Sequence, residues 1–232
     1  MRNAVSLRRN VTLFRYGVNM GRTRLHDETT AAALLDAAEA IVDDAGLEAL
    51  NVRAVAQHVG TTTRAVYSTL GSKDALMAAL GVRAFQLLSA QIAALPRSDD
   101  PTADLIAAAT LGFRRWALDH PALFRIGFQH QVSIPEKTWA RFRTSADHAL
   151  DNLRELMQRV HQDGGLGGRT LEQGTWQFHS LCEGLAAMDL RGSMPPGTDT
   201  LPIWTDALGA LIAGWRLTEP QAQVVGLTGD LH

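Results

Sequence analysis

The sequence is nearly free of cysteine, the residue type that builds disulfides and thiolate metal centres. Cys182 is the single cysteine among 232 residues, so no disulfide can form within the chain and no cluster of thiolates can hold a metal. We therefore expect a reducing, cytoplasmic environment and no metal or cofactor. Long apolar runs are missing too. The longest uncharged apolar stretch, residues 84–95, is far short of the roughly 18–20 residues that cross a membrane, so no membrane partner is expected.

Catalytic motifs are also absent. The eight histidines form no H-E-x-x-H pair, and there is no G-x-S-x-G turn, no phosphate loop ending in Gly-Lys and no dinucleotide-binding glycine pattern. The glycine cluster at 164–168 has the wrong spacing for such a loop and is typical of a turn. Asp119 with His120, and Glu183 near His179, could be imagined as acid and base pairs, but lone histidines beside carboxylates are common on helix surfaces. We therefore do not expect an enzyme.

Acidic residues are missing from residues 1–26, which contain six arginines. The whole chain has 22 Lys and Arg against 24 Asp and Glu, so removing these six arginines leaves a balance of −8 in the other 206 residues. Residues 1–26 are expected to form a basic, flexible arm, and such an arm suits the phosphates of a nucleic acid. Two alternatives remain: an organellar targeting peptide or, for residues 1–19, translated sequence upstream of a start at Met20.

Helical periodicity runs through almost the whole chain from Thr29 onward, and no stretch shows the sustained alternation of a strand. Glycines, prolines and capping residues divide this pattern into about nine helices, and the turn-forming segment 96–101 is the clearest linker. The most regular apolar stripe steps by three and four residues between Trp139 and Val160. The sequence therefore predicts an all-α protein.

Two short predicted helices flank a glycine turn after a longer helix. Asn51 is expected to cap a helix over Val52–Val59 that ends at Gly60, and Thr62 to cap a second helix that runs to about Thr69. The inner faces of these helices are predicted to consist of Val52, Val55, Ala56, Val59, Ala65 and Val66. This layout is that of a helix-turn-helix module, whose second short helix enters the major groove of DNA.

Residues 31–80 resemble the TetR family of bacterial transcription regulators. The resemblance is carried, in order, by "AGLEAL" at the end of one helix, the V-R-A-V-A-x-x-V-G helix, "AVY", and "GSKDAL" at the start of the next helix. Thr61 and Leu70 depart from the family pattern, which usually has an aliphatic residue and a phenylalanine there. The resemblance implies a transcriptional regulator, expected to be a repressor, that binds a palindromic DNA operator as a homodimer and is released by a small-molecule effector.

The resemblance further implies that the residues facing DNA lie on and beside the second short helix. The predicted DNA-binding residues are Asn51, Arg53, Thr62, Thr63, Arg64, Tyr67, Ser68 and Lys73. Lys73 also suits a phosphate on physical grounds, because it would lie beside the exposed N–H groups of a helix start. The alternatives are that Tyr67 only packs against its neighbours and that Arg64 is an idle surface residue.

The rest of the chain is similar in layout to the ligand-binding and dimerisation domain of the family. The segments 113–128 and 180–192 look like signatures of a subclass named for a Trp-His-Gly motif, although Glu183 stands before Gly184 where that subclass commonly has a histidine. The predicted organisation is a basic arm at 1–26, a helix-turn-helix domain at 27–72, a connecting helix at 73–95, a ligand-binding and dimerisation domain at 96–216 and a tail at 217–232.

Aromatic and soft side chains with a few polar groups are typical of a small-molecule pocket. The predicted ligand-binding residues are Phe113, Trp116, Phe128, Phe142, Met157, Trp176, His179, Cys182 and Glu183. At helical spacing, such residues also form an ordinary core.

Repeats of seven residues and steps of three and four residues near the C-terminus predict two helices that pair with a second subunit. The predicted dimer-interface residues are Leu171, Phe178, Leu181, Leu185, Met188, Trp204, Leu208, Leu211 and Trp215. Two such helices per subunit would form a four-helix bundle about a two-fold axis. The alternative is that these residues face the core of their own subunit. For the protein as a whole, a small all-α enzyme and a helical interaction scaffold without specific DNA binding remain the alternatives.

Overall fold

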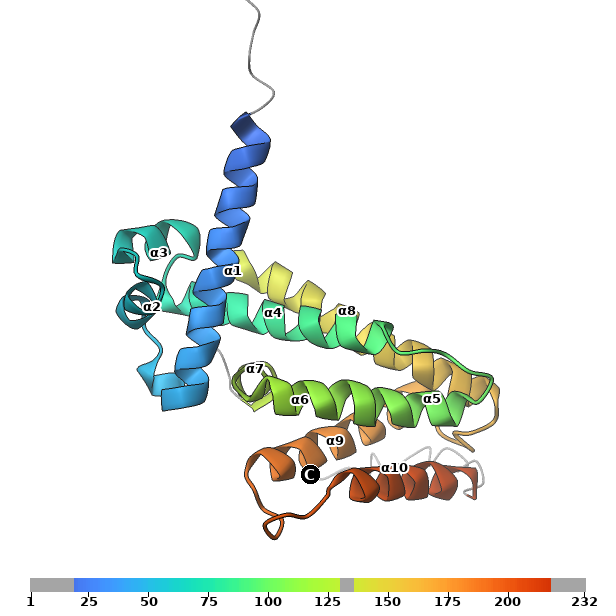
Figure 1. Cartoon of the computed structure of the whole chain (residues 1–232). Helices are drawn as coiled ribbons and strands as arrows, with labels where there is room; N and C mark the ends of the chain where they lie inside the picture. The colour runs from blue at the N-terminus through green and yellow to red at the C-terminus, as the bar shows by residue number, and fades with distance from the viewer. Residues whose placement is uncertain (1–18, 130–135, 218–232) are drawn as a thin grey trace, which may run out of the picture.

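The computed structural model describes residues 19–129 and 136–217, which form helices joined by loops and turns (Figure 1). Within these ranges there is no strand, and the all-α prediction is confirmed. The described helices are α1 (Asn19–Ala45), α2 (Val52–Val59), α3 (Thr63–Thr69), α4 (Lys73–Ala93), α5 (Pro101–Ala107), α6 (Arg115–Asp119), α7 (Pro121–Phe124), α8 (Glu136–Gln162), α9 (Leu171–Leu190) and α10 (Leu201–Arg216). A π-helical segment, 108–114, joins α5 to α6, so the described ranges contain nine separate helices.

The helix-turn-helix prediction agrees with the N-terminal elements. The Asn51 side chain accepts a hydrogen bond from Ala54 N at 2.9 Å and caps α2, and Gly60 ends α2 in the left-handed conformation with φ of 71°. Val52, Val55 and Ala56 are buried as predicted, as is Val66 on α3. Val59 was predicted for the same inner face but is 37% exposed, because it occupies the last turn of α2, where the chain turns away.

The first helix is longer at its start than the sequence predicts. α1 begins at Asn19, so residues 19–26 continue the helix and do not form part of a flexible arm. The remaining residues of the predicted arm, 1–18, and most of the predicted tail, 218–232, lie outside the described residues.

The central helix α4 connects the N-terminal helices to the rest of the protein and lies alongside α8 (Figure 1). Gly81 on α4 allows this close approach, since a Cβ at this position would overlap the Phe142 ring of α8. α4 is also the one helix in the described ranges that is long and apolar enough to cross a membrane, and 56% of its most apolar window is buried inside the protein. Such burial is typical of a core helix.

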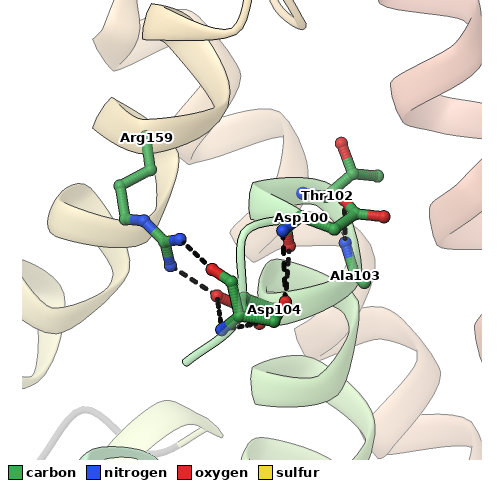
Figure 2. A network of polar contacts seen from close by, with 6 residues as sticks. Asp100, Thr102, Ala103, Asp104 and Arg159 are labelled. Carbon is green, nitrogen blue, oxygen red and sulfur yellow. Dashed lines mark hydrogen bonds and ion pairs between the residues drawn. The ribbon is translucent and has the colours of Figure 1, made fainter. Parts of the chain in front are cut away.

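The predicted linker at 96–101 is anchored to the body of the protein. Asp100 caps α5 by accepting hydrogen bonds from Thr102 N and Ala103 N (Figure 2). Asp104 accepts hydrogen bonds from the backbone N–H and the hydroxyl of Ser98. Arg159 reaches across from α8 to Asp104 with an N–O distance of 2.5 Å. Burial alone would raise the pKa of Asp104, but the bonds from Arg159 and Ser98 outweigh it and lower the pKa. This network fixes the start of α5 against the end of α8.

The helix-turn-helix elements lie at one end of the molecule, and the C-terminal helix pair lies at the other end. α2 and α3 pack beside α1 and the start of α4, whereas α9 and α10 lie together on the far side of α5 and α6 (Figure 1). The two ends are joined through α4 and through a direct contact between α1 and α7.

Candidate nucleic-acid interface and ligand cavity

The outward face of α3 carries polar side chains that no element of the described ranges covers. Thr63, Arg64, Tyr67, Ser68 and Thr69 are exposed, with 58% of the Tyr67 surface open to solvent. Val66, on the opposite face, is fully buried and fixes the helix to the domain core. The predicted recognition surface is thus a helix face that is rigidly mounted and free to meet a partner.

The exposed polar residues differ in whether the protein itself uses them. Asn51 both accepts from Ala54 N and donates to Ala49 O, and the Ser68 hydroxyl donates to Ala65 O at 2.9 Å. The side chains of Arg64 and Tyr67, by contrast, have no hydrogen bond or ion pair among the described residues. Local structure therefore accounts for Asn51 without a partner molecule but does not account for Arg64 and Tyr67.

Charge around α2 and α3 favours a polyanion. Residues 49–73 contain Arg53, Arg64 and Lys73 and no acidic residue, although the chain as a whole is slightly acidic. All three basic side chains are exposed. Lys73 is the first residue of α4, next to the cap formed by the Ser72 side chain, where free backbone N–H groups and a lysine together suit a phosphate.

A polar junction joins the N-terminal helices to the larger C-terminal part. Glu39 of α1 is buried, and its carboxylate lies 2.7 Å from His120 Nδ1, at the break between α6 and α7, and 3.5 Å from Arg83 Nε of α4. Asp36, one turn earlier, lies 2.5 Å from the same arginine but is mostly exposed. Three elements therefore meet at one buried carboxylate.

Asp43 adds a second contact at this junction. It accepts a hydrogen bond from the backbone N–H of Ala122 in α7, and partial burial raises its pKa although this bond and Arg125 lower it. The helix that supports α2 and α3 is thus bonded to the segment that leads into the cavity wall.

A cavity of about 590 Å³ lies between α4, the α5–α6 helix, α8 and α9. This volume is within the roughly 300–1,000 Å³ of small-molecule sites. Its wall is mostly apolar, with rings from Phe85, Phe113, Phe128 and Phe178 and aliphatic side chains from α4 and α8. The cavity is therefore suited to an apolar or aromatic molecule.

Five polar or ionisable side chains interrupt this wall. Asp147 and Arg154 come from α8, and His179, Cys182 and Glu183 come from α9. Burial lowers the pKa of His179 despite the nearby Glu183 carboxylate, so the ring is mostly neutral at pH 7, and burial raises the pKa of the Cys182 thiol, so that group stays protonated. No group of three or more metal-ligating side chains occurs among the described residues.

Six of the predicted ligand residues line this cavity, and three do not. Phe113, Phe128, Trp176, His179, Cys182 and Glu183 are part of the wall. Trp116 and Met157 are fully buried in the core behind it, and Phe142 packs its ring against Phe85 with centroids 5.5 Å apart. These three side chains are not part of the wall of this cavity, because helical spacing identifies an inward face but does not tell which inward side chains border an empty space.

Four predicted dimer residues belong instead to the core of their own chain. Phe178, Trp204, Leu208 and Trp215 are at most 2% exposed, so they cannot contact a second subunit. That part of the prediction was wrong, because an apolar repeat marks a buried face whether the covering helix is in the same chain or another. The other predicted interface residues, which are half-buried, are Leu171, Leu181, Leu185, Met188 and Leu211.

The cavity also contains residues that the sequence reasoning did not select. Phe85, Leu88 and Ile92 come from α4, and Asp147 and Arg154 from α8. The apolar stripe along α8 was a usable signal, since Ala146, Ala149, Leu153 and Leu156 of that stripe all line the cavity. No local pattern shows that α4 provides the opposite wall.

Comparisons with known proteins agree with this architecture. Residues 34–80 match the family model of bacterial regulatory proteins of the TetR family, and residues 106–211 match the model of a Tetracyclin repressor-like C-terminal domain. No curated protein matches the chain significantly.

Solved structures share the fold at low sequence identity. A protein of unknown function from Rhodococcus sp. RHA1 aligns with a TM-score of 0.69 and 20% identity over 80% of this chain and 95% of that chain. The TetR family transcriptional regulator PfmR from Thermus thermophilus aligns with a TM-score of 0.62 and 19% identity, over 78% of this chain and 97% of that chain. A TetR regulator from Streptomyces coelicolor aligns with a TM-score of 0.60 and 19% identity, over 81% of this chain and 97% of that chain. With both family models matched in order and a helix-turn-helix module in front of a helical domain, the chain belongs to the TetR family of DNA-binding transcriptional regulators, which are not enzymes.

Proposed function

We propose that this protein is a cytoplasmic repressor that binds a palindromic operator as a homodimer and leaves it when a small molecule occupies the cavity. The observation that carries the proposal is the combination of an uncovered polar face on α3 with a cavity of about 590 Å³ in the other part of the chain. A DNA-reading surface and a ligand space on one chain are the two parts that a ligand-controlled regulator requires.

DNA recognition is assigned to α3 and its flanks. Arg64 and Tyr67 point away from the core with no intramolecular partner among the described residues, so their donors are free for base edges. Arg53 and Lys73, exposed at the starts of α2 and α4, suit phosphates on either side of the groove. Thr62, Thr63, Ser68 and Asn51 complete the predicted contact surface.

The dimer is assigned to the outer faces of α9 and α10. Ser180 and Gly184 on α9, and Ala210 and Ala213 on α10, are exposed small residues. A Cβ added at Gly184 would meet no atom of its own chain within 4 Å, so packing inside the chain does not require a glycine there. Small side chains allow two helix pairs to approach closely, with Leu181, Leu185, Met188 and Leu211 at the edges.

Release of DNA follows from linkage between the two sites. The Glu39, His120 and Arg83 junction connects α1 to α4 and to the α6–α7 segment, and α7 continues into Gly127 and Phe128 of the cavity wall. A ligand that binds better to one arrangement of these helices changes the separation of the two recognition helices. Two half-sites on DNA require those helices about 34 Å apart, so a changed separation weakens binding.

Selection of operators from random duplex DNA tests this function. The purified protein should enrich a sequence with two inverted half-sites, and the enriched duplex should bind one dimer. The same selection with an Arg64→Ala, Tyr67→Ala double variant should enrich nothing. Enrichment of no sequence by the wild-type protein would contradict the proposal, and enrichment of a single unpaired site would contradict its dimeric part.

A further inference from the structure

The cavity wall has an unusual balance between aromatic rings and charges. Phe85, Phe113, Phe128, Trp176 and Phe178 all contribute to it, and the rings of Phe113 and Phe128 meet edge to face with centroids 5.4 Å apart. The face of an aromatic ring carries a negative electrostatic potential, which attracts a cation and not an anion. The aromatic part of the wall therefore favours a positively charged ligand over a negatively charged one.

Two carboxylates lie in the same wall, and no charged partner among the described residues neutralises either of them. Asp147 has no hydrogen bond or ion pair among the described residues. Glu183 is half-buried, and its nearest basic group is His179, with 3.6 Å between Glu183 Oε2 and His179 Nε2. Because burial keeps the His179 ring mostly neutral at pH 7, it supplies no positive charge to offset Glu183.

One cation also borders the cavity, but it already has a partner. Arg154 Nη1 lies 3.0 Å from Asp151 Oδ1, one turn earlier on α8, and Asp151 is not part of the wall. The side chain of Arg154 is 46% exposed, so water also solvates its charge. The formal charge of the wall is −1 with Arg154 counted, and −2 when Arg154 is balanced by Asp151.

We propose that the cavity binds a lipophilic cation, an ammonium or phosphonium compound with apolar or aromatic substituents, and that Glu183 determines the selectivity for positive charge. The rings surround the apolar substituents, and the Glu183 and Asp147 carboxylates balance the charge. A lipophilic anion of the same shape would meet two carboxylates and the negative faces of the rings. The proposal deepens the function proposed above, because it names the chemical class of ligand for the same cavity.

Tetraphenylphosphonium and tetraphenylborate are suitable probes, because the two ions have nearly the same shape and opposite charges. Calorimetric titration of the full-length protein should give a dissociation constant for tetraphenylphosphonium at least tenfold lower than that for tetraphenylborate. Glu183→Gln should weaken tetraphenylphosphonium binding about tenfold and reduce the difference between the two ions. Asp147→Asn should act in the same direction, and less strongly because Asp147 is more exposed.

The matched control is Glu172→Gln, which removes the same charge from an exposed position on α9 outside the cavity wall. It should leave both dissociation constants unchanged. Equal or tighter binding of tetraphenylborate by the wild-type protein would overturn the proposal, and so would an unchanged preference in a folded Glu183→Gln variant. If tetraphenylphosphonium binds selectively without releasing the operator, the ligand class stands and the effector role of the cavity fails.

Discussion

Exposed polar residues of the recognition module differ in whether they form hydrogen bonds within the protein. Asn51 and Ser68 are exposed and polar, as DNA-contacting residues are, yet both use their polar atoms to bond the backbone of their own helix. Arg64 is equally exposed and has no such bond in the described part of the chain. Exposure alone therefore does not distinguish a residue that shapes the module from one that is free to read DNA.

Substitution of Arg64 should separate DNA affinity from stability. Arg64→Ala should weaken operator binding by about tenfold or more, as expected when one base or phosphate contact of roughly 1–3 kcal/mol is lost. The thermal midpoint should not change, because the side chain is exposed and has no hydrogen bond or ion pair within the described part of the chain. Fluorescence anisotropy with the selected operator and a thermal melt measure the two effects.

Asn51→Ala is the complementary variant. Loss of the α2 cap should lower the free energy of unfolding by about 1 kcal/mol. Operator affinity measured where the protein is fully folded should then fall less than in Arg64→Ala. If Arg64→Ala binds the operator normally, the residue is an idle surface arginine.

At the scale of elements, helices are held in place by buried charges that receive partners from distant parts of the chain. Glu39 joins α1 to α4 and to the α6–α7 break, and Asp104 joins α5 to α8. Their partners are separated in sequence, so each bond fixes one element against another. The two networks differ in position: the first lies between the two parts of the protein, and the second lies within the larger part.

Removal of the Glu39 charge should weaken the junction between the two parts. Glu39→Gln should destabilise the protein by about 1–3 kcal/mol, because a buried charged hydrogen bond is lost, and should reduce the effect of ligand on operator affinity. Asp36→Asn is the matched control: it removes an exposed charge from the same arginine and should cost under about 0.5 kcal/mol. Equal effects of the two variants in chemical unfolding would argue against a junction at Glu39.

Asp104 should make stability depend on acid pH. Its pKa is lowered in the folded protein from an unfolded value of 3.8, so the stabilisation is fully present above that value and is lost as pH falls below it. Urea unfolding of the wild-type protein at a series of pH values from 5 down to about 2, which spans the unfolded value, should show this loss. Asp104→Asn should be less stable at pH 7 and should lose less on acidification. A parallel decline in both proteins would show that other carboxyl groups cause the acid sensitivity.

At the scale of the whole molecule, the surfaces proposed for DNA and for a second subunit lie at different ends. The α2–α3 end carries the polar and basic face, while the outer faces of α9 and α10 carry exposed small residues at the other end (Figure 1). A dimer formed through α9 and α10 would leave both recognition helices uncovered. The arrangement therefore supports binding of DNA by two subunits at once.

A large charged residue in the α10 face should separate the subunits. Ala213→Arg should shift the protein to a monomer in analytical ultracentrifugation and weaken operator binding at least tenfold, because two half-sites can no longer be bound as a unit. Folding should not suffer, since Ala213 is exposed in one subunit. Ala93→Arg, the same change on an exposed position at the end of α4, should remain dimeric. A dimeric Ala213→Arg protein would exclude this face as the interface.

Local sequence determined the helices and the recognition module. The capping side chains of Asn51, Thr62 and Ser72 and the glycine at 60 act on backbone groups within four residues, so their positions fix the bounds of α2, α3 and the start of α4. The polar residues predicted to lie outward on α3 are exposed for the same reason: once the helix is fixed, its period decides which side faces Val66 and the core.

Only the tertiary structure decided what covers each apolar face and where space remains. Trp204 and Trp215 recur with the period expected of an interface but pack inside their own chain. Met157 has the soft side chain expected of a ligand pocket but is fully buried in the hydrophobic core. α4 and α8 approach closely at Gly81, and the cavity wall brings Phe85, Asp147 and Glu183 together from three helices. Helical periodicity specifies a direction around one helix axis, whereas a cavity or an interface depends on the distance between helices, which packing across the whole chain sets.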